Sequence, residues 1–186
     1  MKRFLSSLFF IGLSLQAVGR IEKLAHRSSS ITYKEINGEV LQLNGIGIHR
    51  RFIFDIYRLA LYLKKPTKDS LEIISSKETK FAEMKFLRNL DAKEVQDGFR
   101  DTFNENCPNY CDELSSSMEK LLTSIPDIKD GETINFTFLP TQTIIAIPGG
   151  KSLSFEGAEF GKFFIRAWLG ASPPSERFKR EILKGT

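Results

Sequence analysis

Residues 39–63 read EVLQLNGIGIHRRFIFDIYRLALYL, and this stretch decides the fold. It is rich in Val, Ile, Leu, Phe and Tyr, which favour β-strands, and it lacks a long run of helix-forming residues. We expect two strands here, Glu39 to Leu43 and Arg51 to Leu63, with Gly45 and Gly47 marking the interruption between them. The domain is therefore expected to begin with extended chain.

The rest of the chain alternates between extended and helical patterns. Thr79 to Leu87 predicts another strand. Asp91 to Asn106 predicts a helix, and Asp91 with Glu94 forms the expected capping box at its N-terminus. The helical period places four residues on one face: Val95, Phe99, Thr102 and Asn106. Further helices are expected over 112–124, 157–169 and 173–184, and further strands over 132–139, 142–148 and 151–155. The expected order is strands, then helices, then strands, then helices, and this order predicts an α+β layer architecture.

The first 19 residues have the pattern of a secretory signal. Lys2 and Arg3 form the basic start, Phe4 to Val18 the apolar centre, and Ala17-Val18-Gly19 the small-residue cleavage pattern. The apolar centre is shorter than the roughly 20 residues that span a bilayer, which favours a cleaved signal over a membrane anchor. We therefore expect residues 1–19 to be a signal peptide and residues 20–186 to be a single exported domain without a stable membrane span.

The charge balance argues against a nucleic-acid-binding protein. The whole chain has 27 basic and 23 acidic side chains, and removing the signal takes away two basic ones, which leaves 25 against 23. Basic and acidic residues alternate along most of the chain, whereas nucleic-acid binding requires Lys and Arg gathered on one face. The tightest basic cluster, His49-Arg50-Arg51, is followed at once by Phe52-Ile53-Phe54.

Phenylalanine dominates the aromatic residues, with 16 Phe against 4 Tyr and 1 Trp. Such a chain has the side chains for a large apolar core, or for a core that also encloses an apolar cavity. Phe160, Phe163, Phe164 and Trp168 share one face of the helix expected over 157–169. Composition and periodicity leave open whether these rings fill a solid core or line a cavity.

The two cysteines, Cys107 and Cys111, lie close together in the sequence. A nearby pair in an exported protein tends to form a disulfide, and we expect one here. The two histidines, His26 and His49, are remote from each other, and no metal-binding motif is present. We therefore expect no metal and no cofactor.

Four short strings together resemble the chalcone isomerase superfamily, and most closely its bacterial, secreted, chalcone-isomerase-like branch. In chain order they are Leu43-Asn44-Gly45-Ile46-Gly47, Ala60-Leu61-Tyr62-Leu63, Glu105-Asn106-Cys107, and Trp168-Leu169-Gly170 with Pro174-Ser175. The resemblance covers about residues 36–184. It implies an open-faced β-sandwich, in which a large antiparallel sheet is covered by a layer of helices with a ligand cleft between them. It also implies a periplasmic location.

The plant enzyme of this superfamily cyclises a chalcone, an intramolecular lyase (isomerase) reaction that needs a fixed cation and hydrogen-bond donors. The family's catalytic positions map to five residues of this chain: His49, Tyr57, Phe99, Asn106 and Ala167. Phe99 and Ala167 cannot donate hydrogen bonds, and His49 does not replace a permanent guanidinium charge. The resemblance therefore implies no catalytic residues, and isomerase activity is kept as an alternative.

Other members of the superfamily hold fatty acids in the corresponding cleft, with an arginine at the carboxylate. The resemblance thus implies binding of a small apolar anion such as a fatty acid. Eight residues are the candidates for contacting it: His49, Arg50, Arg51, Tyr57, Phe99, Phe103, Asn106 and Phe164. Adjacent residues of a strand point to opposite faces, so Arg51 shares the side of His49 and Arg50 does not. A structural or interaction protein without a ligand is the second alternative, and the sequence indicates no particular protein partner.

Overall fold

A computed structural model describes residues 32–107 and 112–185 of the chain. The expected signal peptide and Cys111, one half of the expected disulfide, lie outside these residues, so both stay predictions. Among the helices of the described part, none has the length and apolar character that crossing a membrane requires.

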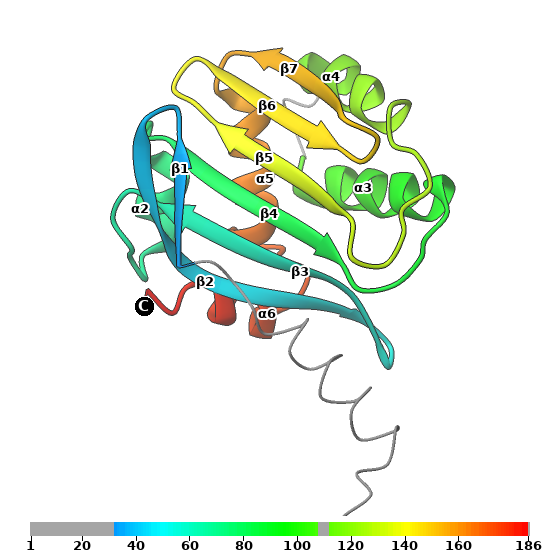
Figure 1. Ribbon diagram of the computed structural model, residues 1–186, viewed down its shortest axis with the longest axis horizontal. Coiled ribbons are helices and arrows are strands. Elements are labelled where there is room, and N and C mark those ends of the chain that lie inside the picture. The colour runs from blue at the N-terminus through cyan, green and yellow to red at the C-terminus, as the bar shows by residue number, and fades with distance from the viewer. Residues whose placement is uncertain (1–31, 108–111, 186) are drawn as a thin grey trace, which may run out of the picture. The chain divides into compact units, whose positions relative to one another are not determined.

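A seven-stranded antiparallel sheet forms the centre of the structure (Figure 1). Its strands lie in chain order, so each one pairs with the next. Their bounds are β1 (Tyr33–Ile36), β2 (Glu39–Arg51), β3 (Phe54–Leu63), β4 (Lys80–Phe86), β5 (Thr133–Phe138), β6 (Gln142–Ile147) and β7 (Lys151–Glu156). In β5 and β6 every second residue is buried, as expected for strands with one face against a core.

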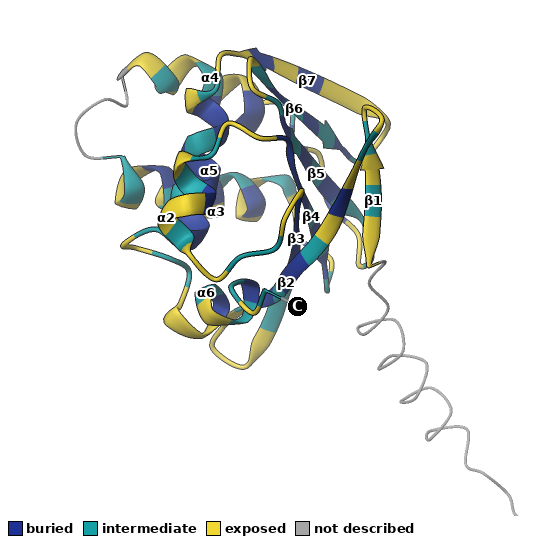
Figure 2. Cartoon of the chain, turned by 90° about the vertical axis from the view of Figure 1, so that its left-hand side faces the viewer, coloured by how far each residue is buried: buried dark blue, intermediate teal, exposed yellow. Residues whose placement is uncertain are grey.

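The helices lie against one face of this sheet (Figure 2). Their bounds are α2 (Ser70–Ser75), α3 (Ala92–Asn106), α4 (Asp112–Leu122), α5 (Glu159–Leu169) and α6 (Glu176–Ile182). The most apolar of the longer helices is α5, with eight buried residues that include Phe160, Phe163, Phe164 and Trp168. The expected α+β architecture, an antiparallel sheet covered by a layer of helices, is confirmed.

The boundary predicted between the first two strands is wrong. Gly45 and Gly47 do not interrupt the chain but lie within the continuous strand β2, and the chain reverses at Phe52 and Ile53. The glycines are required because α6 packs directly on this strand: a Cβ atom at Gly45 would lie 2.3 Å from the carbonyl oxygen of Ile182. A close approach of backbone to backbone, and not a turn, explains these glycines.

Asn44 forms hydrogen bonds that hold the end of α6 against the sheet next to these glycines. Its side-chain amide donates to the Ile182 carbonyl at 2.8 Å, and its side-chain oxygen accepts from the Thr67 backbone N–H at 2.7 Å. Its backbone carbonyl accepts from the Gly185 N–H at 2.9 Å. The pairing of β2 with β3 shifts register between Leu43 and Gly45, which leaves Asn44 without a pairing partner on β3 and available for these contacts.

Other boundaries differ in smaller ways. The strand β1 and the short helix α2 were not predicted. The last helix begins after Ser175, whose hydroxyl accepts from the Phe178 N–H, and not at Pro173. The capping box predicted for α3 is confirmed, because Asp91 accepts from the Glu94 N–H and Glu94 accepts from the Asp91 N–H.

We predict that changing Phe52 to Gly stabilises the fold. Phe52 has a φ of 55° at the first position of the two-residue hairpin loop, where a positive φ favours glycine. Removing this strain should stabilise the folded state by about 1–3 kcal/mol. Glycine gives the unfolded chain more conformational entropy, which offsets about 0.5–1 kcal/mol of this gain. Because the Phe52 side chain is 90% exposed, little burial is lost. Urea unfolding should show a gain of about 1 kcal/mol; a loss would mean that the ring packs against something in the folded protein.

Candidate functional site

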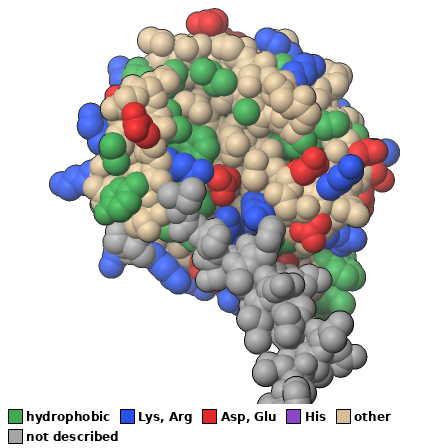
Figure 3. Space-filling view, viewed as in Figure 1, with side chains coloured by type: hydrophobic (Ala, Val, Ile, Leu, Met, Phe, Trp, Pro, Cys, Tyr) green, Lys and Arg blue, Asp and Glu red, His purple; other side chains and the backbone are tan. Residues whose placement is uncertain are grey.

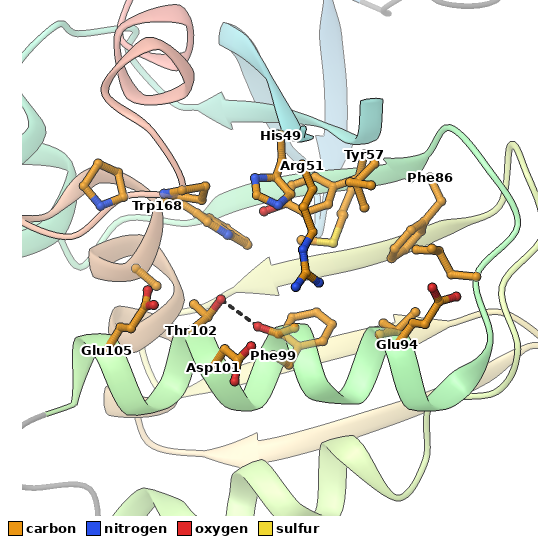
Figure 4. Close-up of a pocket in the computed structure, with 18 of the residues that line it drawn as sticks. His49, Arg51, Tyr57, Phe86, Glu94, Phe99, Asp101, Thr102, Glu105 and Trp168 are labelled. Carbon is orange, nitrogen blue, oxygen red and sulfur yellow. Dashed lines mark hydrogen bonds between the residues drawn. The ribbon is translucent and has the colours of Figure 1, made fainter. Parts of the chain in front are cut away.

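A cavity of about 450 Å³ lies between the sheet and the helices. Its walls come from the end of β2, from β3 and β4, from one face of α3, from α5, and from the segment Ser172–Pro174 that precedes α6. The four residues predicted to share a face of α3, namely Val95, Phe99, Thr102 and Asn106, all line it. Figure 4 shows this arrangement, with α3 below and the strands behind.

Most of the cavity wall is apolar. The sheet contributes Ile56, Met84 and Phe86, and α5 contributes Phe164, Ala167 and Trp168. Phe99 reaches across from α3 and meets Phe164 edge-on, with ring centroids 6.0 Å apart. Phe160 and Phe163 do not line the cavity and are buried in the core instead. The aromatic face of α5 therefore serves both purposes: part of it fills the core and part of it lines a cavity.

Three polar side chains, those of His49, Arg51 and Tyr57, enter the cavity from the sheet. His49 and Tyr57 are direct cross-strand partners, and their rings lie 4.9 Å apart. Arg51 extends from β2 toward α3 (Figure 4). None of the three forms a hydrogen bond or an ion pair with another described residue. Their polar atoms are thus available to a ligand.

The electrostatics of this group favour a single permanent cation. Burial, and secondly the charge of Arg51, lower the pKa of His49 below its usual 6.5. Burial raises the pKa of Tyr57 well above its usual 10. At neutral pH His49 is therefore an uncharged imidazole and Tyr57 an intact phenol, so each can donate a hydrogen bond beside the Arg51 guanidinium.

The polar groups of α3 are already engaged, or lie at the rim. The Asn106 amide donates to the Thr102 carbonyl at 3.1 Å, and the Thr102 hydroxyl donates to the Gly98 carbonyl at 2.8 Å. Asp101 and Glu105 are exposed and lie on the α3 side of the opening. The sheet therefore supplies the donors of His49, Arg51 and Tyr57, whereas α3 contributes mainly apolar surface and acidic rim residues.

The structure brings most of the predicted site residues together. His49, Arg51, Tyr57, Phe99, Asn106, Phe164 and Ala167 all line the cavity. Arg50 does not, because it points away and pairs with Asp55 at 2.7 Å. Phe103 does not either, because its ring packs against Phe163 in the core, with centroids 5.2 Å apart.

Sequence reasoning missed Arg88, a second cation of the cavity wall. It follows the end of β4, and its guanidinium carbon lies 4.9 Å from the centroid of the Phe54 ring. The sequence signal was an arginine directly after a predicted strand. Without the register of β3 and β4, that signal did not show which part of the molecule Arg88 would face.

The chemistry of this set suits binding better than catalysis. Of the five family positions, Phe99 and Ala167 carry no donor, Asn106 uses one of its two amide N–H groups within its own helix, and His49 and Tyr57 keep their donors. Within residues 32–107 and 112–185, no group of three or more His, Cys, Asp or Glu side chains is placed to hold a metal ion. The cavity therefore offers two arginines, Arg51 and Arg88, the neutral donors of His49 and Tyr57, and a largely apolar wall.

The fold and cavity define a class of α+β proteins in which helices cover an antiparallel sheet and enclose a cavity against it. The chain belongs to the chalcone isomerase-like family, whose model matches residues 29–184. Its structure is similar to that of the Arabidopsis thaliana fatty-acid binding protein AtFAP1, with a TM-score of 0.63 and 15% identity over 80% of this chain and 89% of that chain. At this identity the likeness concerns the fold. No curated protein matches the chain.

Proposed function

We propose that this protein binds a single long-chain fatty acid, or a chemically similar apolar anion, and does not act as an enzyme. The observation that carries the proposal is the unpaired guanidinium of Arg51 within a cavity whose remaining wall is largely aromatic and aliphatic. An anionic head would meet Arg51, His49 and Tyr57, and an acyl chain would lie against the aromatic side chains. Charge-assisted hydrogen bonds of this kind are the strong ones.

The dimensions and the fold support this proposal. A volume of about 450 Å³ lies within the range of roughly 300–1,000 Å³ typical of small-molecule sites. The similar Arabidopsis protein is named as a fatty-acid binding protein, so the same fold provides such a site elsewhere. The apolar wall would remove the chain from water, which contributes about 0.8 kcal/mol for each buried methylene group.

Native mass spectrometry of the purified protein tests the proposal. We expect a co-purified or added C16 or C18 fatty acid to bind one per chain, and the corresponding fatty alcohol to bind more weakly because it lacks the anionic head. A protein that carries no lipid and shows no binding of added fatty acids in calorimetry would refute the function. A model chalcone serves as the parallel assay for the isomerase alternative.

Export to the periplasm belongs to the same proposal and rests on the signal pattern of residues 1–19. Fractionation of cells that express the full chain, with the N-terminal residue identified by mass spectrometry, tests it. Recovery only in the cytoplasm with Met1 intact would contradict export.

Fatty-acid binding should tighten as the pH falls below neutral. The pKa of free His49 lies below 6.5, and a bound carboxylate would raise it because the anion stabilises the imidazolium. Binding therefore takes up a proton as the pH falls through the bound-state pKa of His49 toward its lower free-state pKa, and a carboxylic acid stays ionised above its own pKa of about 4 to 5. We expect the dissociation constant to fall roughly threefold to tenfold as His49 becomes protonated in the complex, since one pKa unit corresponds to a tenfold change. Calorimetry at several pH values measures this, and His49→Gln should abolish the dependence.

A further inference from the structure

The tip of the β2–β3 hairpin presents three consecutive apolar side chains to solvent. Phe52 is 90% exposed, Ile53 is 88% exposed and Phe54 is 51% exposed. Phe52 and Ile53 are the most exposed large hydrophobic residues of the described part of the chain. In Figure 3 a group of hydrophobic side chains lies at the lower right, where Figure 1 places the end of this hairpin. Folding alone does not account for such a group, because it buries almost none of the two residues at the loop.

The backbone of the tip strengthens this point. Phe52 occupies a positive φ in a position where glycine is the favoured residue. A large apolar ring held there is neither buried nor conformationally favourable. A residue that costs stability in this way indicates a role outside the folded core.

Unpaired cations lie directly behind the apolar tip. Arg51 precedes Phe52, and the Arg88 guanidinium lies over the Phe54 ring. Neither arginine forms a hydrogen bond or an ion pair with another described residue, whereas Arg50 is neutralised by Asp55. Apolar side chains at a protruding end, with arginines one step behind them, match the layering of a bilayer, in which the acyl region lies below anionic phosphates.

The tip is continuous with the opening of the cavity, because Phe52 and Phe54 also line it. We propose that the β2–β3 hairpin tip inserts into the headgroup region of a phospholipid bilayer, from which the cavity receives its acyl ligand. The transfer of an acyl ligand from the bilayer to the cavity rests on the proposed function, whereas the insertion of the hairpin tip does not. A bilayer fits better than a protein partner because the same rim leads into a cavity suited to an acyl chain. The acidic Asp101 and Glu105 on the α3 side of the opening limit attraction to anionic lipid, so insertion should depend mainly on the apolar tip.

Tryptophan fluorescence tests the insertion at the residue itself. The full chain carrying Ile53→Trp is mixed with vesicles of phosphatidylcholine and phosphatidylglycerol, and Leu71→Trp is the matched control because Leu71 is also exposed, at 74%, but lies on α2. We expect the emission of Ile53→Trp to move to shorter wavelength and to be quenched by brominated phospholipid, with no change for Leu71→Trp. The native Trp168 lines the cavity and is present in both variants, so the Leu71→Trp protein also measures the contribution of Trp168 to any change. An Ile53→Trp emission that vesicles leave unchanged overturns the proposal, as would an equal shift at both positions.

Transfer from vesicles tests the second half. Ile53 does not line the cavity, so Ile53→Ser should leave the affinity for a fatty acid in solution unchanged. The rate at which a fluorescent fatty acid moves from vesicles to the protein should fall about tenfold, since burial of one large aliphatic side chain is lost. Equal transfer rates for Ile53→Ser and Leu71→Ser would overturn the transfer step. If Ile53→Trp inserts but no fatty acid binds in solution, the proposed function fails and the membrane contact stands.

Discussion

Changing Arg51 to Gln is expected to raise the dissociation constant for a long-chain fatty acid by roughly 30-fold, because it removes the permanent cation that lies beside His49 and Tyr57. A hydrogen bond to a charged group contributes about 1.5–3 kcal/mol, and about 2 kcal/mol corresponds to this factor. His49 and Tyr57 remain as neutral donors, so binding should weaken without disappearing. Isothermal titration calorimetry with a C16 acid measures the effect directly.

Arg50→Gln is the matched control for this experiment. Arg50 is the neighbouring residue on the same strand, but its guanidinium pairs with Asp55 and does not reach the cavity. Its replacement should change the affinity by less than about threefold, since partly exposed ion pairs contribute little. The corresponding fatty alcohol adds a second control, because the Arg51→Gln effect should vanish when the ligand carries no charge. Equal losses for both arginine variants would contradict the assignment of Arg51 as the anion-binding group.

Much of the fold was predictable because its signals are local. The capping residues Asp91 and Glu94 and the apolar period of α3 were sufficient to place that helix, and the two short segments 132–139 and 142–148 were correctly predicted as strands β5 and β6. Gly45 and Gly47 were misinterpreted because their cause is remote. The helix that requires them begins at Glu176, and a glycine in close contact with a distant backbone has the same local sequence as one that breaks a strand.

Strand alternation and the family resemblance together predicted part of the site. The alternation separated Arg51 from Arg50, and the resemblance named five positions that all line one cavity. The volume of the cavity and the place of Arg88 were not predictable, because both depend on how α3 and α5 sit on the sheet and on the register of β4. The division of the Phe residues between core and cavity has the same origin. Phe163 and Phe164 are adjacent in sequence, but only Phe164 reaches the cavity.

Changing Gly45 to Ala should destabilise the protein by about 3–5 kcal/mol, an effect at the upper end for a single added methyl group. The new Cβ would lie 2.3 Å from the Ile182 carbonyl oxygen and 2.6 Å from that of Glu181. These are backbone atoms, which cannot rotate away as a side chain would, so α6 has to move off the sheet. That movement also breaks the 2.8 Å hydrogen bond from Asn44 to Ile182. The segment between α5 and α6 lines the cavity, so fatty-acid binding should weaken as well.

Gly98→Ala provides the control that isolates this cause. Gly98 lies within α3, where a Cβ atom meets nothing within 4 Å, so the same substitution should stabilise the helix by about 0.5–1 kcal/mol. Urea unfolding of the two variants measures opposite changes in the free energy of unfolding if the packing of α6 on β2 is as described. Thermal unfolding should show the Gly45→Ala midpoint lower by about 10 °C, given about 2–4 °C for each kcal/mol in a domain of this size. A Gly45→Ala protein as stable as the parent would mean that α6 does not contact β2 through backbone atoms. The hydrogen bond from Asn44 to Ile182 would then not hold α6 on the sheet.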